Sequence, residues 1–324
     1  MLTEGVDTLV GAEKNDVFNA LHKTGTLVLG GLDKIDGGAG TDTLNIVDTF
    51  TAATADFNLP AGMKITNIET LNVTTNGSLG DDALPATAFD ISAMTGLTSF
   101  TGASAGNGTT NTSIKAAGTT DVTLTVAAAQ NVTVDGGKTV SITGGTDAIV
   151  SEAVGAPGTL TAVTLDAVTG SLSTVTGSAI GTLTVKNQNL ASAAVTPTIK
   201  IIDTVSTAVT VAVDNVGYLA DGKTLTTGAT TVEVGAAAKT VTVDSTNKNA
   251  VILKGTTAVT KVIATGTGEN ALTLNTLINV KEFDGSAATG GIDLTGNTLA
   301  MTTIKTGAGK DSLTLLATTK ATVD

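Results

Sequence analysis

The sequence contains no cysteine, no tryptophan and no arginine, and only four prolines. Without cysteine the chain can form neither a disulfide framework nor a thiolate nucleophile. A serine–histidine–aspartate triad would have to use the single histidine, His22, and no His-Glu-x-x-His zinc motif occurs. β-Helical enzymes that act on anionic sugars commonly use basic residues, and arginine is missing here. We therefore expect that the chain is not an enzyme.

Positive charge and long apolar runs are also scarce. The chain has 17 basic residues against 29 acidic ones, a formal net charge of -12. This balance argues against nucleic acid and anionic membrane surfaces as partners, and it suits a chain that recruits divalent cations. No apolar run approaches the roughly 18 residues that would predict a membrane span. The first residues lack the basic and apolar regions of a secretory signal peptide, and the chain opens directly in a repeat. We therefore expect it to be a segment of a longer protein.

Aromatic residues make up only 2% of the chain, whereas small aliphatic residues bring the hydrophobic content to 41%. From residue 121 onward, short alternating stretches such as 121–126, 131–134, 139–142 and 240–243 predict strands. They recur about every 8–12 residues, a spacing that fits either a β-sandwich or a β-solenoid. Short strands, few aromatic residues and weak self-similarity favour an all-β parallel solenoid, in which each coil packs on the next around a narrow core. Tandem immunoglobulin-like sandwiches are the alternative.

Three segments are expected along the chain. Residues 1–48 carry glycine-rich acidic turns, residues 49–120 are less regular, and residues 121–324 form a long run of short strands. Within the middle segment, residues 65–73 predict a strand or one rung of a solenoid, 78–88 an excursion loop and 90–100 a short helical turn. The acidic turn pattern returns near residues 306–315.

The most informative stretch is Gly37-Gly38-Ala39-Gly40-Thr41-Asp42-Thr43-Leu44-Asn45. Its glycines allow a tight turn with positive φ angles, and its exposed carbonyls and the Asp42 carboxylate are hard oxygen ligands. Leu44 begins a strand that points into a core. We predict a Ca²⁺ site formed by Asp42 and the backbone near Gly37, Ala39 and Gly40; the alternative is an ordinary Gly-Asp turn.

Partial copies of this pattern supply further candidate calcium ligands. Asp7 and Asp16 lie nine residues apart, as do Asp33 and Asp42, and each is followed two positions later by an apolar residue. Near the C-terminal end, residues 306–315 match all of the pattern except its first glycine. The additional candidates are Asp7, Asp16, Asp33, Asp36, Gly307 and Asp311. For each, the competing interpretation is a solvated carboxylate or glycine in a turn.

The nonapeptides at 5–45 and 306–315 resemble the repeats of RTX proteins, whose β-roll is a parallel β-helix with Ca²⁺ in its turns. Together with residues 67–73 and the long Thr/Val/Gly-rich remainder, they also resemble bacterial surface-layer proteins of the Caulobacter type. That resemblance implies calcium-dependent assembly of identical copies into an extracellular lattice, and type I secretion through an uncleaved C-terminal signal. It also implies binding to a cell-surface polysaccharide, which we expect only through a region outside this chain.

The expected function is therefore a calcium-dependent structural protein that forms a surface layer or filament. A secreted RTX-type adhesin is one alternative, although no separate ligand-binding module is evident. An ice-binding solenoid is another, because Thr123 and Thr125, and likewise Thr240 and Thr242, would share an outward strand face. The threonines keep no fixed spacing along the chain, which argues against that alternative.

Overall fold

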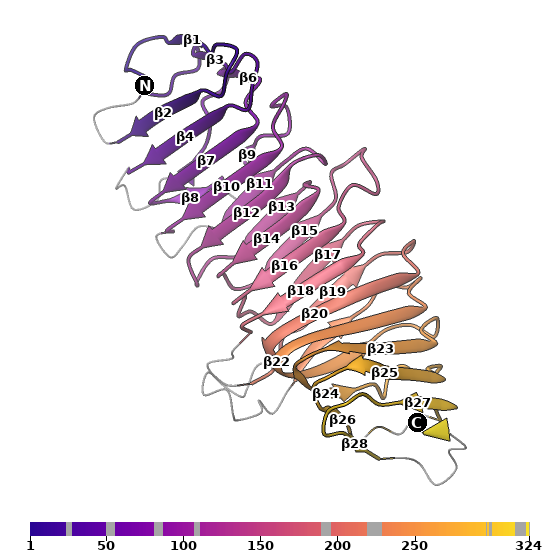
Figure 1. Cartoon of the computed structure of the whole chain (residues 1–324). Coiled ribbons are helices and arrows are strands. Elements are labelled where there is room, and N and C mark those ends of the chain that lie inside the picture. The colour runs from indigo at the N-terminus through magenta and orange to yellow at the C-terminus, as the bar shows by residue number, and fades with distance from the viewer. Residues whose placement is uncertain are drawn as a thin grey trace. The chain divides into compact units, whose positions relative to one another are not determined.

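The computed structural model describes residues 1–23, 28–49, 56–80, 87–106, 111–188, 196–218, 229–295, 297, 300–314 and 322–323. Its regular secondary structure in these residues is entirely β, and every strand pairing defined among them is parallel (Figure 1). Parallel pairing confirms the solenoid, and the immunoglobulin-like alternative is wrong, because such sandwiches are built from antiparallel sheets. No helix capable of crossing a bilayer occurs in this part of the chain.

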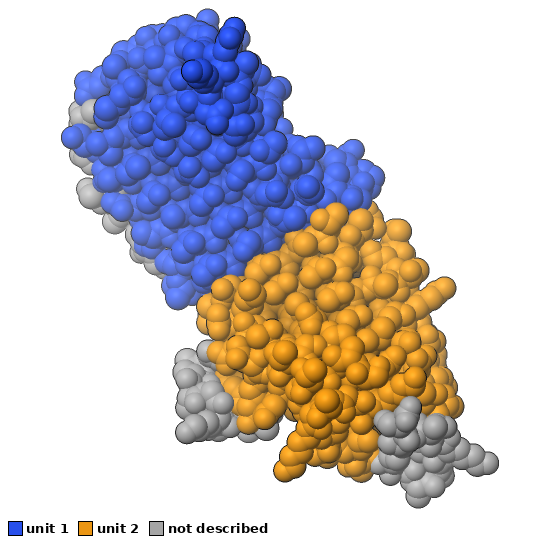
Figure 2. All heavy atoms as spheres, in the orientation of Figure 1, with its two compact units in different colours: residues 1–160 blue, residues 161–324 orange. Residues whose placement is uncertain are grey.

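The chain divides into two compact units, Met1–Leu160 and Thr161–Asp324 (Figure 2). The boundaries expected near residues 48 and 120 both lie inside the first unit. The three segments describe the sequence pattern and remain a prediction. The two units are defined instead by the contacts within each part of the folded chain.

The first unit stacks its strands in files, each strand lying beside the equivalent strand of the neighbouring coil. The longest file of this unit has six strands, in which buried and more exposed side chains alternate. These strands are β2 (Val17–His22), β4 (Thr43–Asp48), β7 (Thr70–Thr75), β10 (Ser99–Ser104), β12 (Asp121–Val126) and β14 (Thr139–Thr143). A second file contains β1 (Thr8–Val10), β3 (Lys34–Asp36) and β6 (Lys64–Thr66). β5 (Asp56–Phe57) pairs with β8 (Ser78–Leu79). A further file runs in order through β9 (Phe89–Asp90), β11 (Thr112–Lys115), β13 (Val132–Asp135) and β15 (Ala148–Ser151), each strand pairing with the next.

The second unit contains two files that share one long strand. The first file comprises β16 (Ala162–Asp166), β18 (Thr182–Lys186), β20 (Ala208–Val216), β22 (Thr240–Lys254), β23 (Lys261–Gly266), β25 (Glu282–Ala288), β27 (Thr303–Lys305) and β29 (Thr322–Val323). The other comprises β17 (Leu172–Thr176), β19 (Thr198–Ile202), β21 (Thr230–Glu233), β22 again, β24 (Glu269–Thr273), β26 (Ile292–Leu294) and β28 (Ser312–Leu313). The first half of β22 pairs with β20 and β23, and its second half with β21 and β24, so this strand turns the corner between the two files.

Strict alternation builds the narrow core. In β12 the side chains of Val122, Leu124 and Val126 are buried, whereas the residues between them are exposed. Since parallel registers place Val122 beside Phe100 and Val140, buried side chains of successive coils form continuous files. Each buried aliphatic contributes roughly 1.5–3 kcal/mol, so a coil is stabilised chiefly by stacking on its neighbours.

The few aromatic residues are concentrated in the core of the first unit. The rings of Phe57, Phe89 and Phe100 follow one another with centroid separations of 5.9 and 5.6 Å. His22, at the end of β2, is half-buried and presents its ring to Phe57 at 6.0 Å. Scarcity of aromatic residues therefore does not mean that the core lacks them, because three of the six phenylalanines pack in one column.

Two local expectations for residues 49–120 are corrected. The helical turn predicted over residues 90–100 is wrong, because that stretch joins β9 to β10 through irregular turns. Its apolar residues Ile91, Leu97 and Phe100 are nevertheless buried, since a chain bending around a coil can bury residues at about the same spacing as a helix. The excursion loop predicted over 78–88 begins instead with the buried strand β8, while residues 81–86 lie outside the described part of the chain.

Candidate calcium-binding turns

The acidic turn residues of the first unit lie in two separate ladders, each running from coil to coil. Asp16, Asp42 and Glu69 precede β2, β4 and β7, and successive members are 26 and 27 residues apart. The Asp42 Oδ1 atom accepts the backbone N–H of Asp16 at 2.7 Å, and Glu69 Oε2 accepts that of Asp42 at 2.7 Å. Asp42 and Glu69 therefore each bind the backbone of the coil before them.

Asp7 and Asp33 form the other ladder, in front of β1 and β3. Asp33 Oδ1 accepts the N–H of Asp7 at 3.0 Å, and its Oδ2 accepts the N–H of Gly30 at 2.7 Å. Asp7 accepts the N–H of Thr3 at 2.7 Å and its hydroxyl at 3.0 Å. Both aspartates are buried, and protein donors already occupy the oxygens of each. The nine-residue spacing of Asp7 and Asp16 thus places them in different ladders of one coil.

Asp42 differs from its ladder neighbours because its unpaired oxygen is buried. Its side chain is fully buried, and Oδ2 has no hydrogen-bond partner in the described residues. In the preceding coil, Asp16 Oδ2 accepts the N–H of Ala12 at 2.6 Å. The equivalent N–H of Gly38 bonds instead to Asp36 Oδ1, at 3.1 Å. A buried carboxylate oxygen without a partner costs about 1–3 kcal/mol or more, which a bound cation would offset.

Gly37 lies against this unpaired oxygen. A Cβ atom added to Gly37 would lie 2.6 Å from Asp42 Oδ2 and 1.7 Å from the carbonyl oxygen of Asn67 in the next coil. No residue with a side chain fits here, so a carboxylate oxygen and a carbonyl oxygen both stay close to the Gly37 backbone. Oxygen ligands of these two kinds are those that Ca²⁺ prefers.

The other predicted ligands lie around or away from this point. Ala39 and Gly40 are exposed in the same turn, where the Ala39 N–H donates to the carbonyl of Ala12 at 3.2 Å. Asp36 is half-buried, and its Oδ1 also accepts the Asn67 side-chain amide at 2.8 Å.

The C-terminal candidates belong to the second unit and form a turn of their own. Asp311 Oδ1 accepts the N–H of Ile292 at 2.8 Å, the same coil-to-coil contact that Asp42 makes. A Cβ on Gly307 would lie 1.9 Å from the carbonyl oxygen of Ala288. This turn therefore reproduces the ladder contact of the first unit.

The donor set fits calcium best at Asp42. No group of three or more His, Cys, Asp or Glu side chains converges as a metal site within the described residues. Any cation at these turns would therefore be held mostly by backbone carbonyls, with one carboxylate. Asp42 meets this requirement with its unpaired Oδ2, whereas Asp33 has both oxygens occupied by N–H donors.

Sequence reasoning missed Glu69 and Asn67 as members of the turn. Neither has a Gly-Gly-x-Gly sequence before it, so the nine-residue pattern does not include them. The signal that could have found Glu69 is its position 27 residues after Asp42, close to the 26-residue separation of Asp16 and Asp42.

Comparison with known proteins adds no family assignment: a scan against protein-family models and a search of curated proteins both found no match.

Proposed function

We propose that this chain is a calcium-stabilised structural protein, or part of one, that assembles with identical copies into an extracellular layer or filament. The observation that supports it best is the buried, unpaired Asp42 Oδ2 beside Gly37, in a turn stacked on neighbouring acidic turns. The RTX-like nonapeptides at 5–45 and 306–315 support the same proposal from the sequence.

Calcium would act on the order of the coils. Asp16, Asp42 and Glu69 bring three carboxylates into one ladder, and backbone N–H groups only partly compensate their mutual repulsion. A cation at Asp42 would reduce that repulsion and satisfy the unpaired oxygen. Since an unfolded chain does not hold these oxygens together, binding would stabilise the folded first unit.

Assembly, export and location rest on the resemblance to surface-layer proteins. A stack of parallel coils presents regular outward faces, which suits repeated contacts between identical copies. Type I secretion and placement at the cell surface would accompany this function. Anchoring to a cell-surface polysaccharide would depend on a region outside this chain.

Calcium titration of a matched pair of variants tests the proposal. At a free Ca²⁺ concentration one hundred times Kd, the wild-type first unit should gain about 2.7 kcal/mol. Asp42→Asn should abolish this gain with little loss of stability in the absence of calcium, because its amide can retain the Asp16 contact. Asp33→Asn should lower the stability without calcium, since it loses two N–H contacts to a charged oxygen, but should keep the calcium response. Calorimetry with Ca²⁺ and with a chelator gives both quantities.

Two outcomes would contradict the proposal. Equal calcium responses in the wild type and Asp42→Asn would remove Asp42 as the site. Negative-stain microscopy of the same samples tests assembly: particles that stay monomeric with and without Ca²⁺ would exclude self-assembly by this chain.

A second candidate function, ice binding, is favoured by the register of outward threonines in the first unit. The sequence argued against it because the spacing of these residues along the chain varies. In space, however, Thr101, Thr123 and Ser141 stand side by side on β10, β12 and β14, and so do Ala103, Thr125 and Thr143. Adjacent strands lie about 4.8 Å apart, so the five hydroxyls form a small two-dimensional array that is interrupted at Ala103.

Thermal hysteresis of dilute purified protein tests this second candidate. The wild type should slow ice growth below the melting point, and Thr123→Tyr should remove the effect by interrupting the array. Thr257→Tyr, at an exposed turn residue of the second unit, is the matched control and should keep full activity. A wild type that neither shapes nor slows ice crystals would eliminate ice binding.

A further inference from the structure

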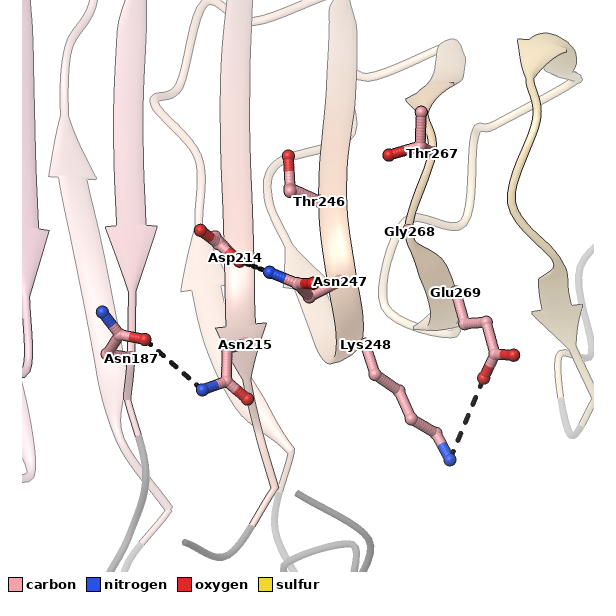
Figure 3. A pocket seen from close by; sticks show the side chains of 9 residues that line it. All are labelled: Asn187, Asp214, Asn215, Thr246, Asn247, Lys248, Thr267, Gly268 and Glu269. Atoms are coloured by element: carbon pink, nitrogen blue, oxygen red, sulfur yellow. Dashed lines mark hydrogen bonds and ion pairs between the residues drawn. The ribbon is translucent and has the colours of Figure 1, made fainter. Parts of the chain in front are cut away.

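A polar hollow of about 740 Å³ opens on the second unit, where β18, β20, β22 and β24 pass one another (Figure 3). Three asparagines, Asn187, Asn215 and Asn247, line it, and all three have left-handed backbone angles, with φ of 48°, 59° and 56°. Asparagine tolerates this conformation better than other residues with a side chain. The left-handed bend at these positions therefore explains why each of them is an asparagine. The three bends also place three side-chain amides beside one hollow.

These amides are only partly used within the protein. Asn215 Nδ2 donates to Asn187 Oδ1 at 3.3 Å, and Asn247 Nδ2 donates to Asp214 Oδ1 at 2.6 Å, as the dashed lines in Figure 3 show. The structure gives no hydrogen bond to the Oδ1 atoms of Asn215 and Asn247 from the residues it describes. Acceptors therefore remain available along the hollow.

A second hollow of about 410 Å³ adjoins the first and shares Lys248 and Glu269 with it. Asn270 lines this second hollow, is only 3% exposed, and has no partner in the described residues for either its amide nitrogen or its amide oxygen. Asn270 shares the inward face of β24 with the buried Leu272, so its amide lies beneath the floor of the hollow and offers no contact to a ligand.

The only tyrosine, Tyr218, also lines the second hollow. Lys248 Nζ lies 5.0 Å from the centroid of its ring, a cation–π contact that holds both side chains in place. Burial, followed by the charges of Glu269 and Asp293, raises the pKa of Tyr218 above its usual range. The phenol therefore stays neutral at ordinary pH.

Charge narrows the class of ligand. Lys248 and Glu269 form an ion pair at 3.9 Å, and Lys310 and Asp293 add one charge of each sign to the second hollow. With Asp214 of the first hollow, the two hollows together hold three acidic and two basic side chains, a net charge of only -1, whereas the chain as a whole has a net charge of -12. A strongly charged ligand would gain little in these surroundings, and an apolar ligand would leave the amides unpaired.

We propose that the two adjoining hollows form one binding site for a neutral saccharide that carries free hydroxyl groups on neighbouring carbons. Each side-chain amide offers a donor and an acceptor next to each other, and a pair of adjacent hydroxyls can accept from one and donate to the other. Sites of this kind combine a few placed polar groups with a preformed hollow. This site is independent of the calcium turns and adds a ligand-binding role to the structural one.

Titration of the ¹⁵N-labelled full chain with neutral trisaccharides tests the proposal, with cellotriose and maltotriose as probes and Ca²⁺ held constant. At least one probe should shift the side-chain amide signals of Asn215 and Asn247 in a saturable way. The double variant Asn215→Gly/Asn247→Gly removes two amides but keeps residues that accept positive φ, and it should weaken binding about tenfold or more. Ala167→Gly is the control for glycine at a left-handed position, since φ there is 54° and the residue lines neither hollow, and it should leave the affinity unchanged.

Glu269→Ala provides a second variant that carries little risk to folding, because the Glu269 side chain is 69% exposed. It removes the carboxylate shared by both hollows and should lower the affinity severalfold. The proposal is overturned if neither trisaccharide binds saturably, if the shifted signals lie outside the two hollows, or if the double variant and Glu269→Ala both bind as the wild type does. Tighter binding of trigalacturonate, an anionic trisaccharide, would show that the ligand class is wrong.

Discussion

Replacing Phe100 by alanine is expected to lower the free energy of unfolding of the first unit by about 3–5 kcal/mol, the usual cost of truncating a buried phenylalanine. Its side chain is fully buried and stacks on Phe89 with centroids 5.6 Å apart. In the neighbouring coils it is in register with Leu71 and Val122. Because the buried side chains of successive coils form a continuous file, the cavity would interrupt that file on both sides of β10.

The core cannot easily close over this cavity. Gly102, two residues further along β10, also faces inward, and a Cβ there would lie 3.0 Å from the tip of the Phe100 ring and 2.7 Å from a methyl of Leu79. The ring therefore occupies space that Gly102 leaves open. Phe100→Leu is the matched control and should cost clearly less. Denaturant unfolding followed by amide exchange would report the loss, and a Phe100→Ala variant as stable as Val47→Ala, at a 41% exposed position, would contradict the packing argument.

Gly37→Ala should destabilise the first coils by about 3 kcal/mol, near the upper end for an overpacked site. The added methyl would lie 1.7 Å from the carbonyl oxygen of Asn67, a backbone atom of the next coil, so the two coils must separate. It would also lie 2.6 Å from Asp42 Oδ2 and displace that carboxylate. We therefore expect Gly37→Ala to lose the stabilisation by calcium in addition to this loss of stability.

Gly5→Ala is the control for this substitution, because the nearest atom to its added methyl is 3.8 Å away. It should leave both the melting temperature and the calcium response close to those of the wild type. Calorimetry in Ca²⁺ and in chelator measures both. A Gly37→Ala protein that melts like Gly5→Ala would mean that the coils are not stacked as closely as the structure places them.

The fold class could be predicted from the sequence because alternation is a local property. In β12 every second residue is aliphatic, which by itself defines a buried and an exposed face. Local spacing gave a wrong prediction over residues 90–100, where apolar residues about three positions apart suggested a helical turn. A bend around a narrow core also brings such residues inward, and only the position of neighbouring coils distinguishes the two.

The candidate site was predictable only in part. The glycine-rich pattern identified Asp42 and Gly37, whose chemistry is contained in one short turn. It could not reveal that Glu69 completes the ladder of Asp16 and Asp42, because the contact joins residues 27 positions apart. Nor could it predict that Asp33 is saturated by N–H donors while Asp42 Oδ2 is left unpaired.

The sequence by itself determined that this chain consists of short strands with one buried face, joined by acidic, glycine-lined turns, because strand alternation and turn chemistry act over a few residues. Only the tertiary structure decided which turns meet. Paired residues of successive coils are separated by as few as 16 residues, between Val132 and Ala148, and by as many as 33, between Thr198 and Thr231, so no single period predicts the register. The polar hollow beside Asn215 and Asn247 has the same origin, since its residues become neighbours only when coils of different length stack with their strands aligned.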